Sequence, residues 1–272
     1  MSHETAQTQA STMEIGLLVG NLDQLEDVAA WGYDYAEISP GLLGVDEDTG
    51  TIEQHALNQI QASPVPVTAM CGFLGRAKVV GPEVDNTRVH DYVIRLFDAM
   101  QQAGVPVIGY GSGGSRFVPN GFSRDQALEQ VNDFLQMCAD LGEPRGVQVA
   151  LEPYNYDDAN LINTVPEGVE MVQRVNRPAI QLMADFFHMR LNSESFDTLA
   201  AVGPYLIHAH IAEPGRGRPQ TTPAEHAAYL QALCEAGYYG RVTQTGELPA
   251  YDSPTEAAKT LKRFAREGGE KK

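Results

Sequence analysis

Residues 147–188 read VQVALEPYNYDDANLINTVPEGVEMVQRVNRPAIQLMADFFH, and this stretch decides the fold. It contains two short apolar runs, 147–152 and 180–185, with the length and composition of buried strands. Between them, Thr164 and Pro166 mark the start of a segment with helical periodicity. A strand, a helix and a second strand in this order are typical of a parallel sheet with crossover helices.

The same alternation continues outward from this unit in both directions. Eight runs are expected as strands: 14–19, 35–39, 65–72, 105–109, 147–152, 180–185, 206–211 and 241–247. Eight stretches are expected as helices: 22–31, 52–62, 86–103, 124–141, 166–175, 196–201, 223–236 and 254–266.

Eight strand–helix repeats in about 250 residues match the size of a closed (β/α)8 TIM barrel. We therefore predict an α/β fold with one barrel domain over residues 13–267, a loose tail at 1–12 and a short tail at 268–272. An open doubly wound sheet is the alternative, but the G-x-G-x-x-G turn expected after its first strand is missing.

Composition restricts the classes of partner. The chain has 272 residues, 43% of them hydrophobic, and a formal net charge of −17, which repels nucleic acid and anionic lipid. We therefore expect a small molecule as partner, with no nucleic acid and no membrane. A homo-oligomer is possible. Three separated cysteines and no secretion signal fit a reducing cytoplasm.

Ionisable side chains lie at the ends of the last four predicted strands: Glu152, Asp185, His210 and Glu247. The carboxyl ends of barrel strands meet at one mouth, where unpaired carboxylates would repel one another unless they bind a cation. Oxygen ligands with one imidazole suit a single divalent metal ion. We expect Mn²⁺ first, with Mg²⁺, Co²⁺ or Zn²⁺ as alternatives.

The residues around these positions resemble a known superfamily. The motifs are LEPYN at 151–155, LINT at 161–164, MADFFHM at 183–189 and HAHIAEPGRGRP at 208–219. They are similar to the xylose-isomerase-like TIM barrels, the sugar isomerases and epimerases, and most of all to the ketose 3-epimerases. The amino-terminal half matches only in the order of its elements.

The resemblance implies roles for particular residues. Glu152 would be a metal ligand and an acid/base, while Asp185 and His210 would be ligands. His188 and Arg216 would hold the oxygens of the substrate, a small-molecule sugar or polyol. Glu213 would lie beside them, either binding the substrate or supporting the residues that do.

One position departs from the family pattern. The ligand glutamate of the eighth strand falls on Thr245 here, and Glu247 comes two residues later, roughly 6.6 Å along a strand. A bulge at Gly246 would return Glu247 to the site. Without it, the metal keeps three protein ligands, and the second acid/base is lost or supplied by Glu213.

These residues predict a metal-dependent carbohydrate isomerase or epimerase. Glu152 and Glu247 are the candidates for removing and returning a proton beside a carbonyl, through an enediolate that the metal stabilises. A keto-sugar or keto-inositol lyase or dehydratase could use the same site. A sugar-binding barrel with a decayed metal site is the non-enzymatic alternative, whereas a nuclease is disfavoured by the negative charge.

Three smaller signals remain. The glycine-rich run 109–116, which ends in Arg116, is expected as a flexible loop, with a phosphate cradle as the alternative. Glu37 and His208 are expected as pocket walls or hydrogen-bonded core groups. Three histidines within predicted helices, away from the strand ends, are expected to be solvated: His55, His90 and His226.

Overall fold

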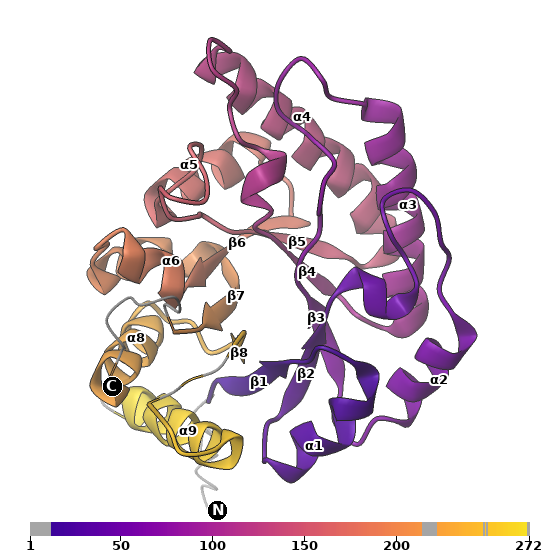
Figure 1. The fold of residues 1–272 in the computed structure, drawn as a ribbon. Coiled ribbons are helices and arrows are strands. Elements are labelled where there is room, and N and C mark those ends of the chain that lie inside the picture. Colours follow the sequence, from indigo (N-terminus) through magenta and orange to yellow (C-terminus); the bar gives the residue numbers. More distant parts are fainter. Residues whose placement is uncertain (1–11, 214–221, 247, 249, 271–272) are drawn as a thin grey trace, which may run out of the picture.

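The predicted TIM barrel is confirmed by the computed structural model, which describes residues 12–213, 222–246, 248 and 250–270. Parallel strands close a barrel in the order β1-β2-β3-β4-β5-β6-β7-β8 (Figure 1). They are β1 Glu14–Leu18, β2 Tyr35–Ile38, β3 Val67–Met70, β4 Val107–Tyr110, β5 Gln148–Leu151, β6 Ile180–Asp185, β7 Leu206–Ile211 and β8 Arg241–Gln244.

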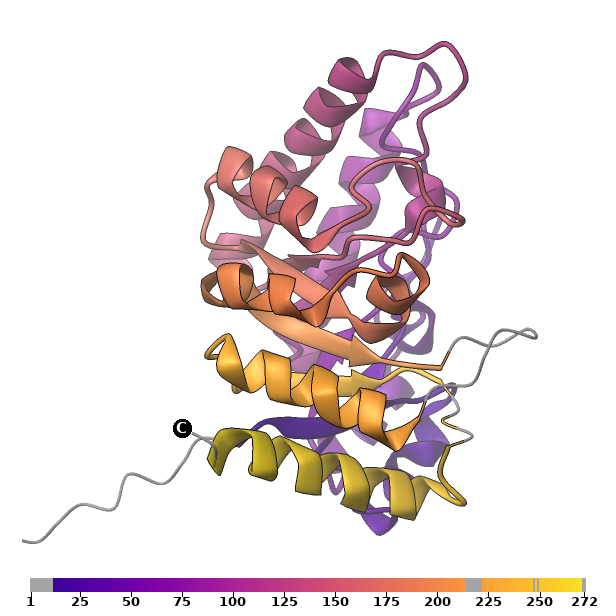
Figure 2. The same ribbon diagram turned by 90° about the vertical axis from the view of Figure 1, so that its left-hand side faces the viewer.

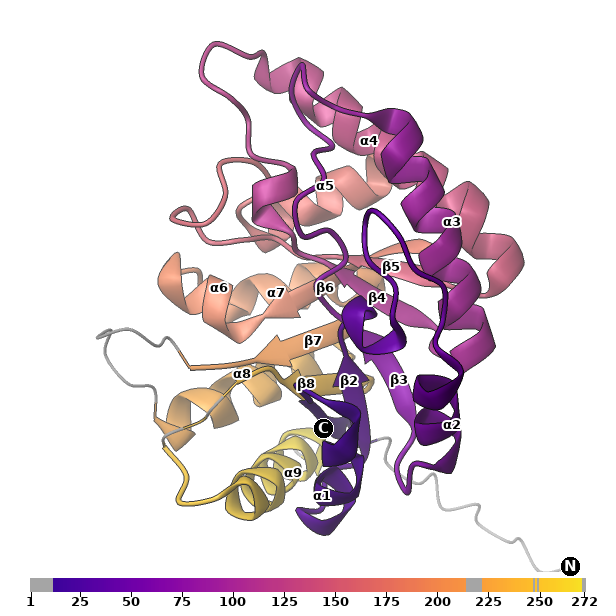
Figure 3. The ribbon, with the colours of Figure 1, turned by 45° about the vertical axis from the view of Figure 1, so that its right-hand side comes forward.

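Helices surround the strands and cover the outer face of the barrel (Figure 1). They are α1 Leu25–Ala30, α2 Gln54–Ala62, α3 Asn86–Ala103, α4 Arg124–Gly142, α5 Val165–Val175, α6 Phe186–Leu191, α7 Leu199–Val202, α8 Pro223–Glu235 and α9 Pro254–Glu270. Figure 2 shows α8 and α9 side by side, and Figure 3 shows α3 beside α4. No helix in the described part of the chain is both long and apolar enough to span a bilayer.

Capping residues explain where several helices begin. The Thr164 side chain accepts a hydrogen bond from the Glu167 backbone at the start of α5, and Ser123 accepts one from Gln126 at the start of α4. Each bond satisfies an N–H group that has no partner within its own helix. Gly104 ends α3 with φ 72°, a left-handed conformation that glycine adopts without steric cost.

The structure differs from the sequence prediction at two places that matter for the site. Strand β8 ends at Gln244, so Thr245 and Gly246 belong to the loop that follows rather than to the strand. A short helix, α6, begins directly after β6 where no helix was predicted, because the Asp185 carboxylate caps it by accepting the Phe187 N–H.

Alternation along the strands carries polar groups to the mouth of the barrel. Val107, Ala150 and Met183 form a small core cluster of their own. Side chains two residues apart on a strand point to the same face. Glu152 therefore shares the face of Ala150, and Asp185 shares that of Met183, each one step closer to the carboxyl end.

Candidate active site and metal centre

A pocket of about 510 Å³ opens at the carboxyl ends of the strands. Strands β3 to β8 each contribute one lining residue at or near their carboxyl ends: Cys71, Gly111, Glu152, Asp185, His210 and Thr245. The remaining walls come from the loops that follow, and they include Tyr154, Asp158, Phe187, His188 and Glu213. The pocket thus gathers the ionisable groups that the strand-end argument predicted.

Glu152, Asp185 and His210 converge in this pocket and are all buried. One potential ligand atom from each lies within 4.8 Å of the other two. The Nδ1 atom of His210 is 3.6 Å from Oε1 of Glu152 and 3.8 Å from Oδ2 of Asp185. Two carboxylates and one imidazole nitrogen therefore surround a single point.

Glu37 contacts His210 on the side of the ring that faces away from Glu152 and Asp185. Its Oε1 atom lies 3.0 Å from Nε2 of His210, and an ionised carboxylate can only accept a hydrogen bond. Nε2 then carries a proton, and Nδ1 is the nitrogen that can give a lone pair to a cation once any proton on it has left. Burial by itself would raise the pKa of Glu37, but His210 and His208 outweigh burial and hold that pKa well below its ordinary value.

The two carboxyl oxygens of Asp185 have different tasks. Oδ1 accepts the Phe187 N–H at 2.6 Å, and Oδ2 faces the imidazoles of His188 and His210 at 3.9 and 3.8 Å. Burial, with Glu152 nearby, raises the pKa of Asp185 to about 6. Glu152 and Asp185 repel each other when both are ionised, and a cation between them would remove that repulsion.

His188 has the same Nε2–H tautomer as His210 but turns its other nitrogen, the protonated Nε2, toward the pocket. Its Nδ1 atom lies 3.3 Å from the backbone N–H of Asn155, a group that can only donate. Nδ1 is therefore the acceptor, and Nε2–H points toward Glu152 and Asp185 at 3.8 and 3.9 Å. Burial lowers the pKa of His188 despite the neighbouring Asp185. A neutral imidazole is thus available as a hydrogen-bond donor in the pocket.

Tyr154 holds the His188 ring in place. The two rings lie 4.0 Å apart between centroids, with an angle of 30° between their planes. The Asn155 side-chain nitrogen also lies 2.8 Å from Nδ1 of His188, so the ring is restrained both over its face and at one edge. An imidazole with so little freedom is preorganised for recognising one substrate oxygen.

Arg116 is not part of a phosphate cradle, and that alternative is wrong. The guanidinium is fully buried and donates to the carbonyl groups of Tyr110, Gly111, Glu152 and Leu161. All of its nitrogens are used, so none is free for an anion. The bonds tie the ends of β4 and β5 together and fix the backbone from which the Glu152 side chain extends.

Gly111 makes room for the Glu152 carboxylate. A Cβ atom at residue 111 would lie 2.2 Å from Oε2 of Glu152 and 2.5 Å from the Tyr154 hydroxyl. Neither separation is compatible with van der Waals radii, so a larger residue would force the Glu152 carboxylate and the Tyr154 ring to move. The glycine-rich run therefore serves close packing around an acid.

The predicted site residues divide into two groups. Glu152, Asp185, His188, His210 and Glu213 line one pocket, together with Thr245. Arg216 and Glu247 lie outside the described residues, so their predicted roles stay predictions.

Sequence reasoning missed the supporting residues Tyr154 and Asn155, although both lie in the quoted LEPYN motif. Their position, two and three residues beyond Glu152, places them at the mouth of the barrel and could have indicated a role in the site. It also treated Glu37 and His208 as pocket walls or core groups. Both are fully buried, and the carboxylate of Glu37 accepts from His208 at 2.9 Å.

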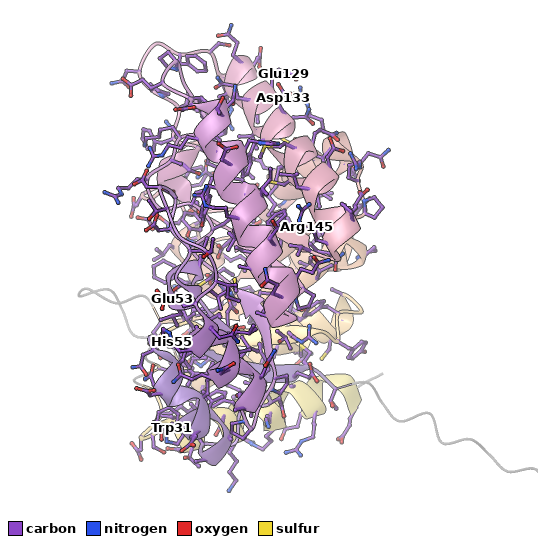
Figure 4. All side chains as sticks on the ribbon, turned by 90° about the vertical axis from the view of Figure 1, so that its right-hand side faces the viewer. Trp31, Glu53, His55, Glu129, Asp133 and Arg145 are labelled. Atoms are coloured by element: carbon purple, nitrogen blue, oxygen red, sulfur yellow. The ribbon has the colours of Figure 1, made fainter. Side chains whose placement is uncertain are left out.

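Two of the helical histidines behave as predicted and one does not. His55 lies on α2 beside Glu53 at the molecular surface (Figure 4), and His90 is exposed as well. His226 is fully buried and its Nδ1 lies 2.8 Å from the Tyr251 hydroxyl, so the prediction that it is solvated is wrong. Because His226 lies on the inward side of α8, the helix packing buries it.

The donor set fits a divalent cation. Two carboxylates at one point repel each other unless a positive charge lies between them, and a lone pair from His210 completes three converging ligands. Oxygen ligands with one nitrogen suit Mn²⁺, Mg²⁺ or Co²⁺ and admit Zn²⁺. The described residues thus include three side chains that could hold one divalent cation.

Comparison with known proteins agrees with this geometry. A family model described as "Xylose isomerase-like TIM barrel" matches residues 25–267. The 3-dehydro-D-guloside 4-epimerase of Escherichia coli K12 is 25% identical over 247 residues, 87% of this chain and 90% of that protein. A D-psicose 3-epimerase of Ruminiclostridium cellulolyticum is 37% identical over 125 residues, 43% of this chain and 39% of that protein.

Solved structures show the same fold. The crystal structure of a D-allulose 3-epimerase from Methylomonas sp. in complex with D-allulose matches with a TM-score of 0.73 and 21% identity. The match covers 94% of this chain and 97% of that one. The sequence matches confirm the resemblance that the motifs indicated, and the structural match confirms the barrel.

Proposed function

The chain belongs to the xylose isomerase-like TIM barrel family, and from that premise we propose that it is a metal-dependent sugar epimerase or isomerase. The observation that carries the proposal is the convergence of Glu152, Asp185 and His210 within 4.8 Å at the mouth of the barrel. The names of the relatives, a 3-dehydro-glycoside epimerase and ketose epimerases, support a carbohydrate with a carbonyl group.

Glu152, Asp185 and His210 would hold the cation. When bound, a divalent ion would stabilise the negative charge that builds on a carbonyl oxygen as the neighbouring C–H loses its proton. The oxygen ligands favour Mn²⁺ within the set that the site admits.

The side chains of the pocket would bind the sugar and move its proton. The His188 Nε2–H would donate to a substrate oxygen and orient the sugar toward Glu152. Glu152 would take the carbon-bound proton, since its carboxylate already faces the centre of the pocket. Arg116 would keep the Glu152 backbone fixed while the proton moves.

Inversion of the carbon requires a second acid/base on the opposite face of the sugar. Glu247 is our proposed candidate, and Arg216 is the proposed partner of a substrate oxygen. Glu213, which lines the pocket, is the alternative acid/base if Glu247 does not enter the site. Turnover measured with Glu247→Gln and with Glu213→Gln distinguishes the two candidates. Only substitution of the residue that acts with Glu152 should abolish epimerisation.

The test is turnover in D₂O with chelated and reloaded protein. Free ketohexoses, ketopentoses and 3-keto-glycosides should be offered. The metal-free protein should be inactive, and Mn²⁺ or Co²⁺ should restore activity. An epimerised product should carry deuterium on the inverted carbon. Activity that persists after proven metal removal would reject the proposal.

Product analysis in the same assay separates the alternatives. A lyase or dehydratase would release water or an alcohol, and the product would lose mass accordingly. A binding protein with a decayed site would retain the sugar unchanged, and Glu247→Gln would affect neither metal affinity nor turnover. Epimerisation with deuterium uptake excludes both.

A further inference from the structure

A buried network lies directly beneath the pocket and shares His210 with the pocket lining. Glu37 on β2 is fully buried and reaches across the barrel interior to β7 and β8. Its Oε1 faces His210, and its Oε2 accepts from His208 and from the Thr243 hydroxyl. The Tyr35 hydroxyl extends the network by bonding to Thr243 at 2.8 Å.

The groups around Glu37 satisfy its buried carboxylate. A buried charge is costly unless it is fully hydrogen-bonded, and here three donors from two other strands satisfy it. Thr243 and His208 bond to the oxygen that does not face His210. The other oxygen therefore has His210 as its partner.

Nδ1 of His210 faces Glu152 and Asp185. The contact with Glu37 decides whether this nitrogen carries a lone pair or a proton. If Nε2 lost its proton to become an acceptor, it would face the carboxylate oxygen of Glu37 with no proton between them. Nδ1 would then carry the proton and turn an N–H toward Glu152 and Asp185. A cation cannot bind a nitrogen that carries a proton.

We propose that Glu37 is a positioning residue of the metal centre, which holds His210 in the tautomer that leaves Nδ1 free to bind a divalent cation. The inference rests on the metal site of the proposed function, though not on its reaction. Partners that orient a metal-binding histidine typically change metal affinity by about 10- to 100-fold when they are removed. Glu37 has no contact with the substrate in this scheme and acts through His210.

The test compares Glu37→Gln with His208→Gln. The first keeps the shape of the side chain but replaces one acceptor oxygen with a donating amide. His208 and His210 then cannot both donate to residue 37, and the Nε2–H tautomer of His210 is no longer enforced. The second variant alters the same buried network on the side away from His210, where Thr243 still satisfies Glu37. It is the matched control for damage to the network itself.

Two readouts are measured without substrate. Calorimetric titration of the chelated protein with Mn²⁺ or Co²⁺ should show an affinity loss of about 10- to 100-fold in Glu37→Gln and none in His208→Gln. Nitrogen-15 spectra of the Zn²⁺-loaded unsubstituted protein should show a protonated Nε2 and an unprotonated Nδ1 on His210. This second readout decides the question even if Glu37→Gln does not fold.

Each outcome has a separate meaning. Unchanged metal affinity in a folded Glu37→Gln protein, or a proton on Nδ1 of His210, would overturn the positioning role and leave the epimerase proposal standing. Failure of all sugars to react, with the predicted affinities, would reject the proposed function and keep the role of Glu37. An unsubstituted protein that binds none of these metals would reject both.

Discussion

Oδ1 of Asp185 accepts the backbone N–H of Phe187 at 2.6 Å, so the carboxylate that ends β6 also begins α6. One residue thereby couples the barrel to a short helix that presents His188 to the pocket. Its remaining oxygen, Oδ2, faces His188 and His210. Asp185 is held in place by the fold and is buried at a cost that a cation would offset.

Asp185→Asn should stabilise the metal-free protein at pH 8. The pKa of Asp185 is raised to about 6 by burial and by Glu152, so the ionised form opposes folding above that pH. Asparagine keeps the oxygen that caps α6 and removes the charge. Urea unfolding with chelator present should give a gain of about 1–3 kcal/mol at pH 8. The gain should vanish near pH 3, below the ordinary pKa of 3.8, where the carboxyl is protonated in the folded and the unfolded state. An equal gain at both pH values would contradict this explanation.

Metal affinity should rise with pH, in two regimes. Burial would lower the pKa of His210, but Glu37 and Glu152 raise it well above its ordinary value, so the cation displaces a proton there over much of the neutral range. Below about pH 6 the cation must also displace the proton of Asp185. Affinity should change by about tenfold per pH unit above pH 6 and by about a hundredfold below it. Titration with Co²⁺ from pH 5 to pH 8 measures this, and a flat profile would argue against ligation by these two residues.

Gly111→Ala should weaken metal binding while the barrel stays folded. The added methyl group would clash with the Glu152 carboxylate and the Tyr154 hydroxyl, so Glu152 must move from its position. We expect an affinity loss of about tenfold or more, of the size seen when a metal ligand is displaced from its orientation. Gly114→Ala is the matched control, since a Cβ atom there meets no atom within 4 Å. Equal affinities in the two variants would remove Gly111 from the site.

His188→Leu should reduce sugar turnover and leave metal affinity almost unchanged. Leucine removes the Nε2–H donor, whose loss in a buried site costs about 1–3 kcal/mol. That corresponds to a fall in kcat/KM of roughly 10- to 100-fold. Steady-state kinetics and metal titration of the same sample distinguish the two effects. If the variant lost its metal instead, His188 would be a ligand rather than a substrate-binding residue.

The fold could be predicted from the sequence because its signal is periodic. Each strand is a short apolar run between helical stretches, and Glu152, Asp185 and His210 each come at or just beyond a strand end. In a closed parallel barrel the carboxyl ends of all strands lie at the same mouth, so these three residues were expected to lie close together. The structure brings them within 4.8 Å of one another.

Other parts of the site depend on contacts between distant residues and carry no local signal. Glu37 contacts His208 and His210 across more than 170 positions of sequence. Arg116 belongs to a glycine-rich run that resembles a flexible loop, and only the path of β4 and β5 shows that its charge is buried against carbonyl groups. Helix α6 is too short to show helical periodicity, and its cap, Asp185, is also the last residue of β6.

Crystals of the protein soaked with Mn²⁺ provide the most direct test of the metal site. Anomalous scattering should place one ion with Nδ1 of His210 and a carboxylate oxygen each from Glu152 and Asp185 at about 2.0–2.3 Å. Such a map would establish the point on which the proposed chemistry depends. A map with no ion between these three residues, or with ions only at the outer surface, would contradict it.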